Sequence, residues 1–155
     1  MMRKIDSLLN EYGESHQNRL NKRIHWICVP SIFFSVVGFL WSIPNGPLES
    51  INSPFVNWAT IALILVAIYY LSISPSLALG MVIFSVICLY LCFFIDQFVD
   101  IWKVSLVVFI VAWIGQFYGH KVEGKRPSFF KDLQFLLIGP AWLMHFLYKK
   151  SGISY

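Results

Sequence analysis

Charged side chains are scarce in this sequence. Lysine, arginine, aspartate and glutamate make up 13% of the 155 residues, whereas hydrophobic residues make up 57%. An ordinary globular chain has about 25% charged and roughly 45–50% apolar residues. The few charges are also unevenly placed, and long stretches have none. This composition excludes a water-soluble globular domain and a disordered chain, and it predicts an integral membrane protein.

Cysteines are few, and the common catalytic motifs are absent. The three cysteines, Cys28, Cys88 and Cys92, lie inside apolar runs, which is typical of packing residues and excludes a disulfide scaffold. The sequence contains no P-loop, no Rossmann fingerprint and no nucleophile elbow. We attribute the net charge of +4 to membrane topology and anionic lipid, not to nucleic acid.

Apolar runs long enough to cross a bilayer are the main feature that is present. They cover residues 26–43, 55–73, 76–95 and 101–118, and about 18–20 residues span a hydrocarbon core of roughly 30 Å. Pro75 separates the second run from the third and predicts a tight helical hairpin there. A shorter run, 133–148, contains Gly139-Pro140 and predicts a fifth or re-entrant helix. We therefore expect an all-α protein with four transmembrane helices, forming one membrane domain over residues 1–155.

Residues 1–25 are polar and have a helical period. Apolar side chains recur on one face of this segment, at Ile5, Leu8, Leu9 and Tyr12. The pattern predicts an amphipathic helix lying on the membrane. We expect the chain to turn between His16 and His25, with Asn18 and Asn21 supplying the N-cap chemistry. The segment would then form an amphipathic helical hairpin.

The placement of lysine and arginine predicts the topology. Four crossings put the N-terminus and the loop 119–132 on the same side of the membrane. If the last segment re-enters without crossing, that side holds 11 of the 12 basic residues, all except Lys103. By the positive-inside rule this side is cytoplasmic. The host membrane would be the inner membrane of a bacterium or the endoplasmic reticulum of a eukaryote.

Three of the four histidines are expected at this predicted cytoplasmic face, and the fourth reaches it if the last segment re-enters or lies flat. His16 and His25 precede the first span, His120 follows the fourth, and His145 lies in the last short segment. Imidazole is the usual ligand for iron, zinc, copper or nickel, so the set predicts a metal site. Three polar residues would orient these ligands or act in catalysis: Asn21, Gln116 and Glu123. The alternative is that the histidines cap helices or contact lipid headgroups.

Several of these residues form spaced motifs. The first is Tyr12-x3-His16-x4-Asn21-x3-His25-x4-Pro30. The second is Trp113-x2-Gln116-x2-Gly119-His120-x2-Glu123, followed by Arg126-Pro127, and the third is Gly139-Pro140. Together they resemble the signatures of a family of small membrane proteins, the yeast-type 2-hydroxy-fatty-acid dioxygenases. The similarity extends over almost the whole chain, in order.

The resemblance implies an Fe(II)-dependent enzyme that uses O2. It would convert a long-chain 2-hydroxy fatty acid to CO2 and a fatty acid one carbon shorter. By the resemblance, His16, His25 and His120 are iron ligands, and His145 joins them by its position alone.

Other residues are expected at the same site. We expect Arg126 to hold the substrate carboxylate and Tyr12 or Glu123 to handle protons. Six-coordinate iron with three protein ligands has room for a chelating hydroxy acid and dioxygen, so His145 is the ligand expected to be released. Two alternatives stay open: a bis-histidine haem protein, and a non-enzymatic lipid-binding or structural membrane protein. The oligomeric state is not set by the sequence.

Overall fold

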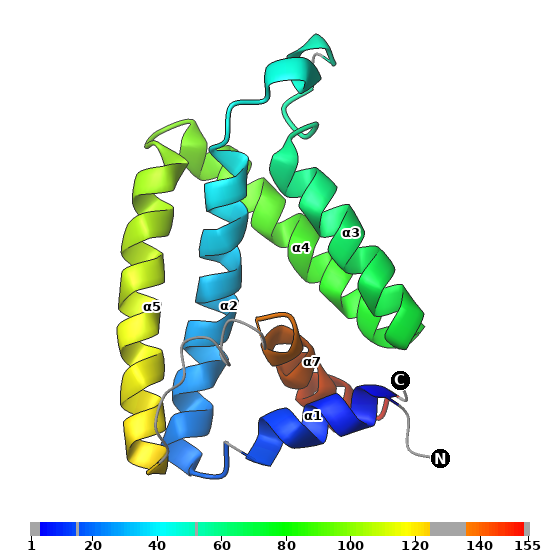
Figure 1. Ribbon diagram of the computed structural model, residues 1–155, viewed down its shortest axis with the longest axis vertical. Coiled ribbons are helices and arrows are strands. Elements are labelled where there is room, and N and C mark those ends of the chain that lie inside the picture. Colours follow the sequence, from blue (N-terminus) through cyan, green and yellow to red (C-terminus); the bar gives the residue numbers. More distant parts are fainter. Residues whose placement is uncertain (1–3, 15, 52, 125–135, 154–155) are drawn as a thin grey trace. The chain divides into compact units, whose positions relative to one another are not determined.

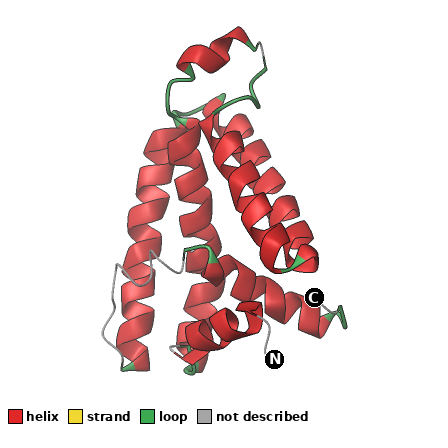
Figure 2. Ribbon diagram, turned by 45° about the vertical axis from the view of Figure 1, so that its right-hand side comes forward, coloured by secondary structure: helices red, strands yellow, loops and turns green. Residues whose placement is uncertain are grey.

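The computed structural model describes residues 4–14, 16–51, 53–124 and 136–153. Over these ranges the protein is all-α, as predicted (Figures 1 and 2). Six α-helices and one short 3-10 helix lie in the described part: α1 (Lys4–Glu14), α2 (Arg19–Trp41), η1 (Gly46–Ser50), α3 (Trp58–Ile73), α4 (Pro75–Asp96), α5 (Ile101–Glu123) and α7 (Ile138–Lys150).

The chain divides into two compact units. One comprises Met1–Phe33 with Ile110–Tyr155, and the other comprises Phe34–Phe109. Helices α2 and α5 are continuous, so each contributes one end to each unit. All the histidines belong to the first unit, because they lie at residues 16, 25, 120 and 145. That the chain forms a single membrane domain stays a prediction.

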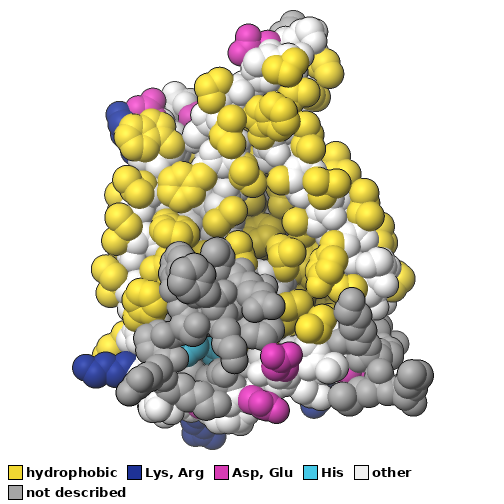
Figure 3. All heavy atoms as spheres, viewed as in Figure 1, with side chains coloured by type: hydrophobic (Ala, Val, Ile, Leu, Met, Phe, Trp, Pro, Cys, Tyr) yellow, Lys and Arg dark blue, Asp and Glu magenta, His cyan; other side chains and the backbone are white. Residues whose placement is uncertain are grey.

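Three helices are long and apolar enough to cross a membrane. These are α2, α4 and α5, with 23, 22 and 23 residues, or at least about 33 Å at 1.5 Å per residue. Helix α3 is apolar but has only 16 residues. Hydrophobic side chains cover much of the helix surface that Figure 3 presents, and many are exposed, Leu79, Val107 and Ile114 among them. These helices make the chain an integral membrane protein.

The second unit contains the predicted hairpin of α3 and α4. Ser74 separates the two helices in extended conformation, its hydroxyl accepts a hydrogen bond from the backbone N–H of Leu77 (3.4 Å), and Pro75 begins α4. The predicted break at Pro75 is therefore confirmed. In the same unit, Asp96 accepts hydrogen bonds from the indole of Trp41 and the backbone N–H of Ile101, both at 3.1 Å. Asp96, the last residue of α4, thus contacts both α2 and the start of α5.

The first unit differs from the predicted amphipathic hairpin in two respects. Helix α1 packs against α7 (Figure 1), and its apolar residues Ile5, Leu9 and Tyr12 are buried. The apolar stripe of α1 therefore packs on protein, although the sequence predicted contact with lipid. An amphipathic pattern shows which face is apolar but not whether protein or lipid covers it. In addition, the arm after the turn is not a separate helix. It is the first part of α2, which begins at Arg19 instead of residue 26 and runs on without a break.

Candidate metal centre

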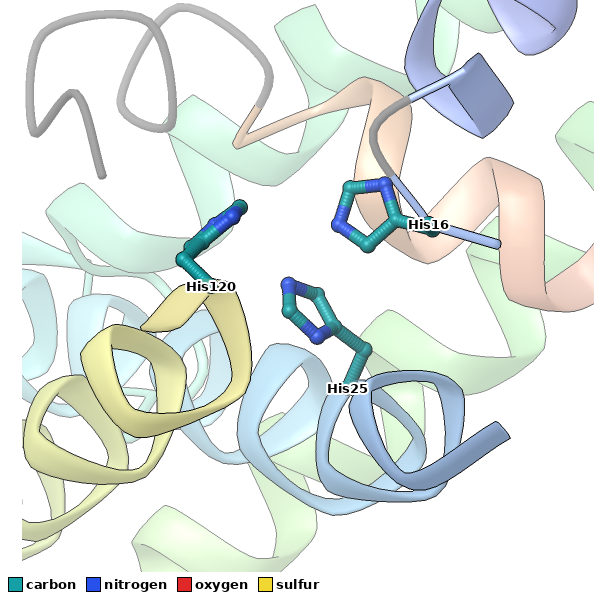
Figure 4. Close-up of side chains that lie close together, drawn as sticks. All are labelled: His16, His25 and His120. Atoms are coloured by element: carbon teal, nitrogen blue, oxygen red, sulfur yellow. The ribbon is translucent and has the colours of Figure 1, made fainter. Parts of the chain in front are cut away.

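Three of the four histidines meet at one point of the first unit. His16 lies in the short segment between α1 and α2, His25 in the second turn of α2, and His120 in the last turn of α5 (Figure 4). All three are buried, with 2%, 1% and 4% of their surface exposed. Each offers a ring nitrogen, and these three atoms lie within 4.8 Å of one another. Residues far apart in the sequence thus form one buried imidazole cluster.

The spacing of this cluster suits a single cation. Two imidazole nitrogens bound to one ion at about 2.1 Å lie within roughly 4.2 Å of each other, so small side-chain rotations would suffice. The rings of His16 and His25 meet edge to face, with centroids 4.2 Å apart. This contact leaves no gap for a porphyrin between the two rings, so the geometry does not favour the haem alternative.

Backbone carbonyls fix the ring orientation of two of these histidines. The Nδ1 atom of His16 lies 2.6 Å from the carbonyl oxygen of Tyr12, and that of His25 lies 3.0 Å from the carbonyl oxygen of Asn21. A carbonyl oxygen only accepts, so each Nδ1 must carry the hydrogen. The lone pair of each neutral ring is then on Nε2, the atom left to bind a metal. The donor set therefore fits a transition metal that prefers imidazole.

Tyr12 supports His16 from one side. Its ring stacks on the imidazole with centroids 4.3 Å apart and an interplanar angle of 17°. The edge of Trp142 in α7 packs against the same tyrosine at 5.4 Å. The orientation of His16 is therefore set by packing as well as by its hydrogen bond, and Tyr12 lies beside the cluster as predicted.

Glu123 connects the end of α5 to the segment that carries His16. Its carboxylate accepts hydrogen bonds from the backbone N–H groups of Gln17 (2.8 Å) and Asn18 (2.9 Å) and from the side-chain amide of Asn21 (2.9 Å). Glu123, His120 and Gln116 lie on one continuous helix, because α5 extends past Gly119. Sequence reasoning did not identify Gln17 and Asn18 as partners, since backbone donors leave no mark in the sequence.

Of the two predicted capping residues of α2, Asn18 has this role and Asn21 does not. The side-chain oxygen of Asn18 accepts from the backbone N–H of Leu20 (2.8 Å) and lies 3.5 Å from that of Asn21. Asn18 therefore caps α2 as predicted. Asn21 lies inside the helix, so its predicted capping role is wrong. Its amide instead contacts Glu123.

Gly119 allows α2 and α5 to approach closely beside the cluster. A Cβ atom at this position would collide with the side-chain oxygen of Asn21 and lie 3.4 Å from a methyl group of Ile24. We predict that Gly119→Ala separates the two helices, lowers the melting temperature and weakens metal binding by at least tenfold, as losses of supporting contacts do. Thermal unfolding followed by circular dichroism and metal titration would check this. Gly13→Ala is the matched control, because its Cβ would have an ordinary contact at 3.4 Å; equal effects of both variants would contradict the prediction.

The other predicted site residues lie in different surroundings. Gln116 is buried one turn before His120, and its side-chain oxygen accepts no hydrogen bond from the described residues. His145 is half-buried on α7 and is not part of the imidazole cluster that the described residues form. Burial lowers the pKa of His145, the charge of Lys149 lowers it further, and Asp6 only partly offsets this. Arg126 lies outside the described residues.

A cavity of about 390 Å³ connects His145 with the cluster. His16, His145, Lys22 and Trp142 all line it, together with polar residues of α1. Sequence reasoning did not identify Trp142 as a residue of this site. Its position three residues before His145, on the helix that begins at Gly139-Pro140, was the available signal.

Comparison with known proteins shows the family to which the chain belongs. Residues 2–151 match the family model described as "2-hydroxy-palmitic acid dioxygenase Mpo1-like", so the chain belongs to the Mpo1-like family. The 2-hydroxy-palmitic acid dioxygenase MPO1 of Saccharomyces cerevisiae is 33% identical over 149 residues, which is 94% of this chain and 80% of the yeast protein. No solved structure matches the chain. The resemblance drawn from the motifs is confirmed at the level of the family.

Proposed function

We propose that this protein is an Fe(II)-dependent dioxygenase of 2-hydroxy fatty acids. It would release CO2 and a fatty acid one carbon shorter. The observation that carries the proposal is the convergence of His16, His25 and His120 into one buried cluster. The family, whose yeast member is a 2-hydroxy-palmitic acid dioxygenase, supports this reaction.

Ferrous iron is the metal that best suits both these three imidazole ligands and a dioxygenase reaction. Neutral imidazoles suit iron, and three protein ligands leave positions open for other molecules. When bound, iron would supply the redox chemistry that lets dioxygen react with an organic acid. We assign His16, His25 and His120 as its ligands. His145 lies outside the cluster, so we place it on the substrate side of the site.

The cavity of about 390 Å³ provides a place for the polar end of the substrate. Its wall carries Lys22 and His145 beside His16, and these groups can hold a carboxylate and a hydroxyl near the cluster. The acyl chain would lie along apolar protein or lipid surface, where burial contributes about 0.8 kcal/mol per CH2. Arg126 stays a second candidate for the carboxylate. Tyr12 and Gln116 lie beside the imidazole cluster and form part of its wall. Glu123 and Asn21 hold the segment that carries His16 in position.

The reaction balances with dioxygen as the only oxidant. The acid R–CHOH–COOH and O2 give R–COOH, CO2 and H2O, in which the C1–C2 bond breaks and C2 is oxidised to a carboxyl group. Dioxygen takes up four electrons, three from C2 and one from C1, and the two remaining hydrogen atoms leave in water. No external reductant is needed. We propose that the site lies at the inner face of the membrane, because the N-terminus is predicted to be cytoplasmic.

An assay of the purified protein tests the proposed activity. We expect iron-loaded protein with 2-hydroxypalmitic acid and O2 to give CO2 and pentadecanoic acid in equal amounts. Palmitic acid, which lacks the 2-hydroxyl group, should give neither product. Radiolabelled CO2 from carboxyl-labelled substrate and mass spectrometry of the shortened acid provide the measurement. Stoichiometric iron without either product would contradict the proposal and leave the lipid-binding alternative.

A further inference from the structure

A second, much smaller cavity lies next to the imidazole cluster. Its volume is about 20 Å³, and the described residues lining it are Tyr12, Val29, Ile32, Trp113, Gln116, Leu136 and Gly139. About 10–15 Å³ on this measure is enough for one water molecule. The cavity therefore has room for one molecule of two or three atoms and is too small for a long acyl chain.

This small cavity lies one helical turn from His25 and from His120, and Tyr12 on its wall stacks on the ring of His16. Tyr12 precedes His16 by four residues, Val29 follows His25 by four, and Gln116 precedes His120 by four. Residues four apart lie above one another on a helix. On α2, Val29 lies nearer the middle of the helix than His25, and on α5, Gln116 lies nearer the middle than His120. The cavity is thus on the side of the cluster toward the middle of α2 and α5, two of the helices long and apolar enough to cross a membrane.

The small cavity is separate from the larger one. The two share no lining residue, and the larger one is lined mainly by α1 and α7 with Lys22 and His145. Lys22 and His145 are the groups of the larger cavity that can hold the acid, and Asp6 and Glu14 also line it. In contrast, most of the lining of the small cavity is apolar, with Val29, Ile32 and Leu136 contributing aliphatic side chains. An apolar diatomic molecule fits such a space.

Gly139 keeps the small cavity open. A Cβ atom at this position would lie 3.1 Å from the hydroxyl oxygen of Tyr12 and 3.1 Å from a methyl carbon of Val29. Both neighbours line the same cavity. Any larger residue at position 139 would therefore push into the wall of the cavity, which explains the glycine of the Gly139-Pro140 motif.

We propose that this cavity is a dioxygen site, filled from the membrane and emptying toward the imidazole cluster. This inference rests on the proposed function, since it supplies that reaction with its second substrate. Dioxygen is more soluble in hydrocarbon than in water, so the apolar halves of α2 and α5 are a direct source. The acid would then approach through the larger cavity without crossing the path of dioxygen. A bound water, held by Tyr12 and Gln116, is the competing occupant.

Paramagnetic relaxation by dioxygen tests the site without metal or catalysis. Metal-free protein in lipid nanodiscs, with labelled methyl groups, is equilibrated with O2 or with N2. We expect the methyl protons of Val29 and Ile32 to relax several-fold faster under O2 than the methyl of Ala112. Ala112 is the matched reference, because it is buried near the middle of α5 and does not line the cavity. Equal relaxation of all three residues would overturn the proposal, and a cavity held by water would give that result.

Filling the cavity gives a second test in the iron-loaded enzyme. Val29→Ile adds one methylene to its wall, and we expect the KM for dioxygen to rise about tenfold, the lower end of the effect of one methylene in a close-fitting site. The KM for the hydroxy acid and the iron content should not change. Val37→Ile is the control, since Val37 is buried on the same helix away from the cavity. Equal KM values for dioxygen in both variants would contradict the proposal. Fast relaxation of Val29 without any turnover would instead refute only the proposed function.

Discussion

Replacing His25 with alanine is expected to remove iron from the protein and to abolish oxidation of 2-hydroxy acids. His25 is 1% exposed and packs against both other rings of the cluster, with centroids 4.2 Å from His16 and 5.2 Å from His120. Loss of an outer-sphere partner alone costs about 10–100-fold in metal affinity, so loss of a ligand should cost more than about 100-fold. Iron per chain, measured by mass spectrometry after reconstitution with Fe(II), should fall from one to near zero.

His145→Ala provides the matched control for this prediction. It removes the same side chain from the same unit, but His145 lies outside the cluster and lines the larger cavity, not the small one. We expect this variant to keep its iron and to show a higher KM for the hydroxy acid. Complete loss of iron from His145→Ala would make it a fourth ligand. Full iron retention in His25→Ala, with unchanged helicity, would show that the cluster does not bind the metal.

The gathering of the histidines could be predicted from the sequence because it depends on few physical rules. Run length and charge placement set where each helix ends, and helix ends on one membrane face lie near one another. This reasoning brought His16, His25 and His120 together, and the structure places them within one cluster. The same rules put His145 at that face but could not give its distance from the other three histidines. Helix α7 has only 13 residues, and its position depends on side-chain packing against α1, which hydropathy does not predict.

The helix boundaries were less predictable because hydropathy and helicity end at different residues. Helix α2 begins at Arg19 and α5 ends at Glu123, although the apolar runs cover only 26–43 and 101–118. The extra turns are polar, and their stability comes from contacts such as those of Glu123 with Asn18 and Asn21. These contacts join residues more than 100 positions apart. Local pattern does not contain that information.

Glu123→Gln is expected to loosen the segment that carries His16 and to weaken iron binding by about 10–100-fold. The carboxylate uses both oxygens to accept three N–H groups, at 2.8, 2.9 and 2.9 Å. A glutamine has one oxygen, and its NH2 group would face donors that need an acceptor. Hydrogen bonds to charged groups contribute about 1.5–3 kcal/mol each, so we expect the free energy of unfolding to fall by about 2 kcal/mol. Iron titration and chemical unfolding would measure the two effects.

Glu11→Gln is the control for Glu123→Gln, because Glu11 is exposed on α1 and the change in charge is the same. A positioning role requires that Glu123→Gln, once saturated with Fe(II), keeps a kcat within a few-fold of the native value. Normal iron affinity with a kcat reduced by orders of magnitude would contradict that role and make Glu123 the proton carrier. The two outcomes differ because a carboxylate that accepts three hydrogen bonds is held in its ionised form. In that state it fixes the backbone around His16 and has no proton to give.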